Sequence, residues 1–84
     1  MKLFDSELRI MEILWREGES TAKRMADELK DTTGWNVNTT YTMIKRMIGK
    51  GIIERREPGF VCVPLVKKAS VQAAETDDLI DRVF

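Results

Sequence analysis

One segment of this chain, from Trp35 to Gly51, carries side chains whose types and spacing suit the recognition of DNA. Residues that hydrogen-bond base edges or phosphate oxygens recur there along one face of a predicted helix: Asn38, Thr39, Thr42, Lys45 and Arg46. A second row at helical spacing can bury against a small core: Thr40, Met43, Ile44 and Met47. Because a helix tied to a core along one face can offer its other face as a rigid unit, the pattern predicts a helix that reads a DNA groove.

The inventory of reactive side chains argues against catalysis and against metal binding. The sequence has no His, and its single Cys, Cys62, lies between two valines in a predicted strand, where it would act as a small hydrophobe. It has no Gly-rich phosphate loop and no Gly-x-Ser-x-Gly motif. The usual nucleophile and base pairs cannot be assembled, and one Cys without His falls short of a tetrahedral zinc or copper site. We therefore expect that the chain is not an enzyme and that it binds no cofactor and no metal ion.

Length and charge restrict the function classes further. The 84 residues suit one domain, close to the size at which one hydrophobic core is only just sufficient. The 14 basic and 14 acidic side chains cancel, but residues 36–57 hold five basic groups against two acidic ones. Such a local cationic patch fits a nucleic-acid partner, although charged runs are more often solvated surface. No apolar run suits a membrane span or a secretory signal, so we expect a cytoplasmic protein without membrane contact.

Capping residues and apolar periodicity predict two helices in the first part of the chain. Ser6 is expected to cap a helix over residues 7–17, in which an apolar stripe recurs at helical spacing. Ser20 or Thr21 is expected to cap a second, amphipathic helix that reaches about Lys30.

The third helix follows a turn at residues 31–34, which is predicted from composition. Asn36 is a good N-cap for this helix, and Gly49 or Gly51 is expected to end it.

Two strands and a final helical segment are predicted after the third helix. Segments 52–56 and 60–65 are typical of strands joined by a tight turn at Pro58-Gly59, which makes a β-hairpin. Near the end of the chain, apolar side chains cluster on one side of a possible helix: Leu79, Ile80, Val83 and Phe84.

This order of elements predicts a mainly α fold with a small β-hairpin. Three helices followed by a two- or three-stranded wing, with the start of a fourth helix, is the order of a winged helix-turn-helix, in which the third helix enters the major groove. The same architecture also serves proteins that bind only other proteins, so the side chains of the site must decide the function.

Several segments, taken in order and spacing over nearly the whole chain, carry a resemblance to a known family. They are Glu12-Ile13-Leu14-Trp15 with Gly18-Glu19, Thr21-Ala22, Trp35, Thr39, Thr42, Ile44-Lys45-Arg46-Met47 with Lys50-Gly51, Pro64-Leu65-Val66, Glu75-Thr76 and Asp81-Arg82-Val83-Phe84. The chain resembles the penicillinase repressors of the BlaI/MecI/CopY type. The resemblance implies a winged-helix repressor that binds a palindromic operator as a homodimer. It also implies that the outward row of the third helix contacts DNA: Asn38, Thr39, Thr42, Lys45 and Arg46.

The same resemblance suggests how the chain is divided. Residues 1–66 correspond to the winged-helix DNA-binding domain, and residues 67–84 to a linker and the start of a C-terminal dimerisation helix that is truncated here. The fragment itself is expected to bind weakly if it is monomeric, because two linked half-site contacts raise affinity roughly 10²–10⁴-fold.

Departures from the family pattern concern operator choice and the wing. Tyr41 stands where family members usually have a polar or basic residue, and its ring would lie along a sugar or contact a thymine methyl group. The hairpin is about two residues shorter than usual and has Phe60 where an arginine often follows the wing glycine. The wing contacts therefore rest on Arg55 and Arg56, and at most one of these should face phosphate because strand residues alternate sides.

A second hypothesis keeps the fold and changes the partner. A winged-helix protein–protein interaction module without DNA binding would use an apolar surface of Tyr41, Ile48 and Phe60, and zero net charge favours it. Trp15 and Trp35 are expected to pack in the core under either hypothesis. Salt separates the two, because phosphate contacts weaken steeply as salt rises and an apolar protein contact does not.

Overall fold

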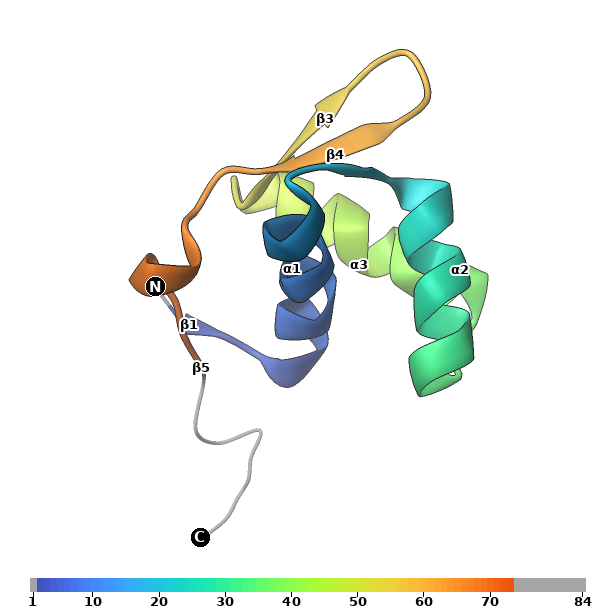
Figure 1. The fold of residues 1–84 in the computed structure, drawn as a ribbon, viewed down its shortest axis with the longest axis horizontal. Coiled ribbons are helices and arrows are strands. Elements are labelled where there is room, and N and C mark those ends of the chain that lie inside the picture. Colours follow the sequence, from blue (N-terminus) through green and yellow to red (C-terminus); the bar gives the residue numbers. More distant parts are fainter. Residues whose placement is uncertain (1, 74–84) are drawn as a thin grey trace, which may run out of the picture.

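A computed structural model describes residues 2–73 and contains three helices and five short strands. The helices are α1 (Asp5–Glu17), α2 (Ala22–Thr33) and α3 (Val37–Gly49), and the short 3₁₀ helix η1 spans Lys68–Ser70. The strands are β1 (Lys2–Leu3), β2 (Ser20–Thr21), β3 (Ile53–Arg56), β4 (Val61–Pro64) and β5 (Gln72–Ala73). The mainly α architecture with a wing is confirmed (Figure 1). The predicted fourth helix, with Leu79, Ile80, Val83 and Phe84, lies outside the described residues.

The start of α1 corrects the prediction that Ser6 is its N-cap. The helix begins at Asp5, and Phe4 occupies the N-cap position with extended backbone. The carboxylate of Glu7 accepts a hydrogen bond from the Phe4 N–H at 3.1 Å. The helix therefore begins two residues earlier than a Ser6 cap would allow, because a glutamate inside the first turn satisfies the backbone donor of the N-cap residue.

The end of α2 corrects the predicted turn at residues 31–34. Of the two predicted caps, Ser20 and Thr21, it is Thr21 that caps the helix, and its side chain accepts a hydrogen bond from the Arg24 N–H at 3.1 Å. The helix then continues to Thr33, where the hydroxyl groups of Thr32 and Thr33 donate to carbonyl oxygens one turn back, at 3.0 and 2.6 Å. These bonds let two threonines complete a last helical turn that composition assigned to a loop.

Helix α3 has the predicted limits. The side chain of Asn36 accepts a hydrogen bond from the Asn38 N–H at 2.7 Å, and the helix ends at Gly49. Gly34, with a φ of 77°, ends α2 in the left-handed conformation that glycine adopts without steric cost, and so turns the chain toward this cap.

The wing is a hairpin of β3 and β4 with a third strand beside it. The strands are antiparallel in the order β2-β4-β3, and Arg55 and Arg56 lie opposite Cys62 and Val61. Strand β2 was predicted only as a helix cap, but Ser20 and Thr21 also pair with β4. A parallel pair of β1 and β5, which the sequence did not suggest, joins the two ends of the described chain.

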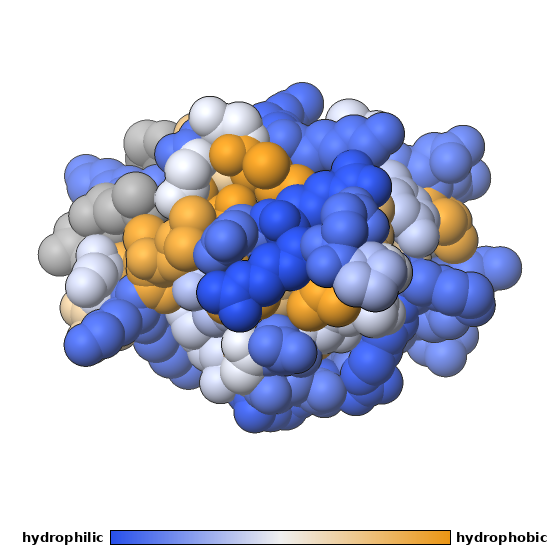
Figure 2. Space-filling view, turned by 90° about the horizontal axis from the view of Figure 1, so that it is seen from above, coloured by the Kyte–Doolittle hydropathy of each residue, from blue (hydrophilic) through white to orange (hydrophobic). Residues whose placement is uncertain are grey.

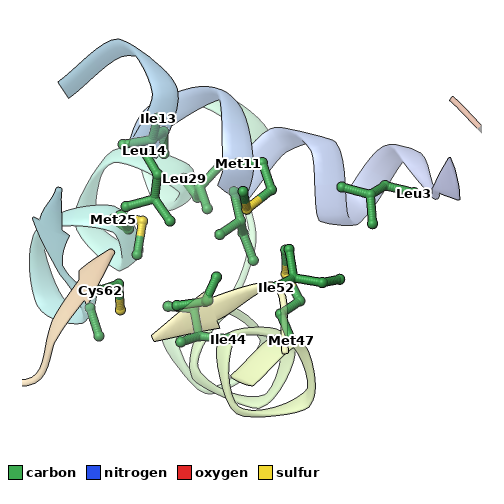
Figure 3. Close-up of a cluster of buried hydrophobic side chains, with 13 residues drawn as sticks. Leu3, Met11, Ile13, Leu14, Met25, Leu29, Ile44, Met47, Ile52 and Cys62 are labelled. Atoms are coloured by element: carbon green, nitrogen blue, oxygen red, sulfur yellow. The ribbon is translucent and has the colours of Figure 1, made fainter. Parts of the chain in front are cut away.

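The core lies where the three helices meet the wing. Figure 3 shows buried side chains of α1 and α2 facing Ile44 and Met47 of α3, with Cys62 of β4 at one edge. Cys62 is wholly buried in this core, which confirms its role as a small hydrophobe, and burial raises the pKa of its thiol to about 11. Trp15 and Trp35 pack against this core as predicted, and the Trp15 ring N–H donates to the Val66 carbonyl at 2.9 Å.

Candidate nucleic-acid interface

The two rows of α3 face opposite environments. Thr40, Ile44 and Met47 are 0% exposed and pack into the core, and Met43, predicted in the same row, is half-buried against it. The row predicted to contact DNA is exposed along the whole helix: Asn38, Thr39, Thr42, Lys45 and Arg46. The separation of buried and exposed faces is therefore confirmed, and the DNA contacts of the exposed row remain a prediction.

An ion pair fixes the C-terminal end of α3 to the first helix. The Glu7 side chain is 2% exposed, and its carboxylate lies 2.7 Å from the ammonium group of Lys50, which follows the helix directly. This is the same carboxylate that caps α1 through its other oxygen. A buried carboxylate with both oxygens engaged holds its partners in one geometry, so Lys50 ties the C-terminal end of α3 to α1.

The cations of α3 have no counter-ion among the residues that the structure describes. Within residues 2–73, neither Lys45 nor Arg46 forms an ion pair or a side-chain hydrogen bond. Some other exposed cations do so, since Arg16 and Arg24 share Glu17, whereas Arg9, Lys30 and Lys67 form no ion pair within the described residues either. The helix face therefore presents positive charge that a phosphate can meet without displacing a carboxylate.

The wing arginines are also exposed, but each is paired within its own hairpin. The guanidinium of Arg55 pairs with Glu57 through Nε, and that of Arg56 lies 3.3 Å from Glu54. The hydrogen bond from Arg55, followed by that from the Phe60 N–H, lowers the pKa of the Glu57 carboxyl group. Because residues two apart share a strand face, these pairs place the two arginines on opposite sides, as alternation predicted.

Tyr41 and Phe60 lie at the junction between α3 and the wing. The two rings meet edge to face, with centroids 5.9 Å apart and an angle of 68° between the planes. Both side chains are half-buried against the core. The sequence placed Tyr41 at the DNA surface. It noted Phe60 as a departure in the wing and grouped it with Tyr41 and Ile48 on the apolar surface of the alternative hypothesis. Neither that grouping nor the Pro58-Gly59 turn reveals the edge-to-face contact of the two rings.

Figure 2 looks onto the wing side of the molecule and shows hydrophilic residues running across the middle of this face, with hydrophobic residues on either side of them.

A shallow hollow of about 390 Å³ lies elsewhere, on α1, and is lined by Glu12, Trp15, Arg16 and Lys68. Its Lys68 pairs with Glu12 at 3.2 Å. In the part of the chain that the structure covers, no cluster of three or more His, Cys, Asp or Glu side chains suits a metal ion, and no helix could cross a membrane.

The sequence model of the penicillinase repressor family matches residues 3–84. The chain belongs to the penicillinase repressor family. This confirms the resemblance read from the sequence. A curated member, the penicillinase repressor of Bacillus licheniformis, is 25% identical over 85 residues, which cover 99% of this chain and 66% of the relative. The methicillin resistance regulatory protein MecI of Staphylococcus aureus is 24% identical, with 99% and 69% covered. The chain thus spans about two thirds of the length of these relatives.

Two solved structures of the family share the fold. The solution structure of the DNA-binding domain of the repressor BlaI has a TM-score of 0.74 and 27% identity over 86% of this chain and 90% of that one. Monomeric Bacillus licheniformis BlaI in complex with the blaP half-operator has a TM-score of 0.75 and 27% identity, with 90% and 100% covered. The winged-helix fold is therefore confirmed, and this member of the penicillinase repressor family has the fold of a repressor's DNA-binding domain.

Proposed function

We propose that this chain is the operator-binding part of a transcriptional repressor and that α3 reads the major groove of its operator. The observation that carries the proposal is the helix itself. Its inner row is buried at Thr40, Ile44 and Met47, while its outer row is polar and cationic and has no counter-ion within residues 2–73. The BlaI structure in complex with a half-operator supports it, because a chain of the same fold and family binds DNA there.

The exposed side chains divide into base-reading and backbone-binding groups. Asn38, Thr39 and Thr42 are short and carry hydrogen-bonding groups that suit base edges, and Tyr41 offers its ring edge to a sugar or a thymine methyl group. The longer cations reach phosphate oxygens, from α3 through Lys45 and Arg46 and from the wing through one of Arg55 and Arg56. Base contacts would then set the sequence, and the cations would set the register and the affinity.

The full-length protein is proposed to act as a homodimer on a palindromic operator. Residues 1–66 would contain the DNA-binding domain, and residues 67–84 would lead into the dimerisation region. A two-fold symmetric dimer presents two copies of α3 to two half-sites, which accounts for operator symmetry. We place its action in the cytoplasm, without a membrane partner and without catalysis, because a repressor works by occupying DNA.

The alternative, a protein–protein interaction module, needs an apolar surface that is open to a partner. Its three candidate residues, Tyr41, Ile48 and Phe60, are each half-buried against this chain's own core, and two of them contact one another. These contacts leave less apolar surface to a partner than the sequence suggested, and they favour the DNA-binding proposal.

The test selects duplexes from a random-sequence library with the 84-residue chain and measures affinity for the enriched duplex by fluorescence anisotropy over a range of salt. We expect the logarithm of the affinity to fall linearly with the logarithm of the salt concentration, with a slope of about −0.9 per neutralised phosphate. Lys45→Ala should make this slope shallower, whereas Lys23→Ala on α2, a cation that pairs with Asp27, should leave it unchanged. No enrichment, or an affinity that ignores salt, would overturn the proposal.

A further inference from the structure

The turn of the wing is organised around one carboxylate. One oxygen of Glu57 accepts a hydrogen bond from the Phe60 N–H at 3.3 Å, and its other oxygen pairs with Nε of Arg55. The guanidinium carbon of Arg55 lies 3.8 Å from the centroid of the Phe60 ring. Arg55 is therefore held on two sides, by a carboxylate at Nε and by an aromatic ring below its plane. We call these three residues, with Tyr41, the wing-turn cluster.

Phe60 also connects the wing to both helices of the helix-turn-helix. Its ring meets Tyr41 of α3 edge to face, with centroids 5.9 Å apart. Its carbonyl oxygen accepts a hydrogen bond from the N–H of Ala22, the first residue of α2, at 3.0 Å. Phe60 therefore fixes the position of Arg55 relative to α3, which carries the proposed base-reading row, and relative to α2, which precedes it.

The backbone at Phe60 indicates that this placement is maintained against a steric cost. Its φ is 53°, and among the described residues it is the one residue other than glycine with a positive φ. A bulky side chain adopts this conformation at a cost in energy, and such strain is retained where the surrounding structure holds it for a purpose. Here the left-handed conformation puts the ring between Arg55 and Tyr41.

We propose that Phe60 is a positioning residue of the DNA interface. It holds the guanidinium of Arg55 at a fixed position relative to α3, so that Arg55 can contact a phosphate group while the exposed row of α3 contacts bases. The inference rests on the proposed function. The ion pair with Glu57 uses Nε, and the terminal nitrogens of Arg55 are the pair that can bind a phosphate group in bidentate fashion. Holding this side chain before binding removes the rotamer entropy that a free arginine would lose on the phosphate.

The test compares Phe60→Leu, Phe60→Tyr and Arg55→Ala in the 84-residue chain, with the selected duplex as the probe. Phe4→Leu is the matched control, because it makes the same change at a half-exposed phenylalanine at the start of α1, far from the wing in Figure 1. Urea unfolding at the binding temperature gives the folded fraction of each variant, and affinity is expressed per folded molecule.

We expect Phe60→Leu to weaken binding about fivefold and to make the salt slope shallower by about 0.9, as Arg55→Ala does. Combining the two substitutions should change neither quantity further, because both remove the same phosphate contact. Phe60→Tyr keeps the ring and should retain the slope. Phe4→Leu should leave both quantities unchanged. If Phe60→Leu does not fold, Phe60→Met carries the same expectation.

A residue that only stabilises the wing would give a different result. Phe60→Leu would then keep the parental salt slope, or its effect and that of Arg55→Ala would add, and either outcome would overturn the inference. An Arg55→Ala chain that binds as the parent does would overturn it as well. In all three cases a steep salt dependence of the parent chain's affinity would still support the proposed function. A parent chain whose affinity does not change with salt would contradict both the proposed function and this inference.

Discussion

Helix α3 and the wing each carry two exposed cations, and the two pairs are in opposite electrostatic states. Lys45 and Arg46 are exposed and, within residues 2–73, have no carboxylate partner, whereas Arg55 and Arg56 are each paired inside the hairpin. The difference follows from geometry. A helix can place its cations on one face while the opposite face is the core, but the strand order Glu-Arg-Arg-Glu puts a carboxylate two residues from each arginine, on the same side.

Exposed positive charge is therefore not equivalent in the two regions. A phosphate that meets α3 gains an unpaired cation, and a phosphate that meets the wing competes with a carboxylate already in place. We expect the helix to supply most of the electrostatic affinity and the wing to supply placement. The predictions below either break this distinction or sharpen it.

The largest effect should come from removing the anchor of α3. Ile44 is 0% exposed and faces the core, so Ile44→Ala should lower the free energy of unfolding by about 2–5 kcal/mol. The neighbouring Lys45→Ala, on the exposed face, should change it by less than about 0.5 kcal/mol. Urea unfolding of both variants measures the difference. Equal losses would mean that the two faces of the helix are not distinct.

The next effect separates the helix from the wing in binding. Lys45→Ala should weaken binding to the selected duplex about tenfold. Arg56→Ala should weaken it only about twofold, because Arg56 pairs with Glu54 and lies on the opposite side of the strand from Arg55, the arginine proposed to contact phosphate. Both losses should be similar for all duplex sequences, since phosphate contacts carry no base information. Anisotropy titrations at one salt concentration give the ratio. A larger loss for Arg56→Ala would reverse the comparison.

The two regions also differ in how much the sequence could predict. The faces of α3 followed from a 3.6-residue period that local sequence displays, with Thr40, Ile44 and Met47 on one side and the polar row on the other. The hairpin followed from Pro58-Gly59 between two segments typical of strands, 52–56 and 60–65. Both patterns are local in the sequence, and the structure confirms the two elements that they predict.

What the sequence missed depends on long-range contacts or on a single hydrogen bond. The contact of Tyr41 with Phe60 and the pairing of β1 with β5 join residues far apart in the chain, and no local pattern encodes them. The early start of α1 depends on the carboxylate of Glu7 reaching back to Phe4. Capping preferences predicted a serine there because they count residue types at a cap and not a bond that a side chain inside the helix supplies.

A smaller effect concerns the inner face of α3. The hydroxyl oxygen of Thr40 is buried and has no hydrogen-bond partner among the described residues. Replacing it with a methyl group of similar shape, in Thr40→Val, should raise the free energy of unfolding by about 1 kcal/mol, because a buried polar group without a partner is destabilising. Thr42→Val makes the same change on the exposed face and should give no such gain. Urea unfolding compares the two, and a gain at Thr42 alone would contradict the assignment of faces.

The smallest effect should come from releasing a wing arginine. Glu54→Gln removes the carboxylate that pairs with Arg56 and should tighten binding to the selected duplex about twofold to threefold. Glu12→Gln is the control. It removes a carboxylate of α1 that pairs with Lys68 of η1, and the affinity for the duplex should not change. Competition titrations resolve a difference of this size. Unchanged affinity in Glu54→Gln would mean that internal pairing does not limit the wing.

The most direct test of the central claim, that the outward face of α3 reads bases, is a binding profile of Thr42→Ala against duplexes in which each base pair of the selected site is replaced in turn. The account predicts that discrimination falls by about 1–3 kcal/mol at one base-pair position and stays unchanged at the others. A profile identical to that of the parent chain, or one lowered evenly at every position, would contradict it.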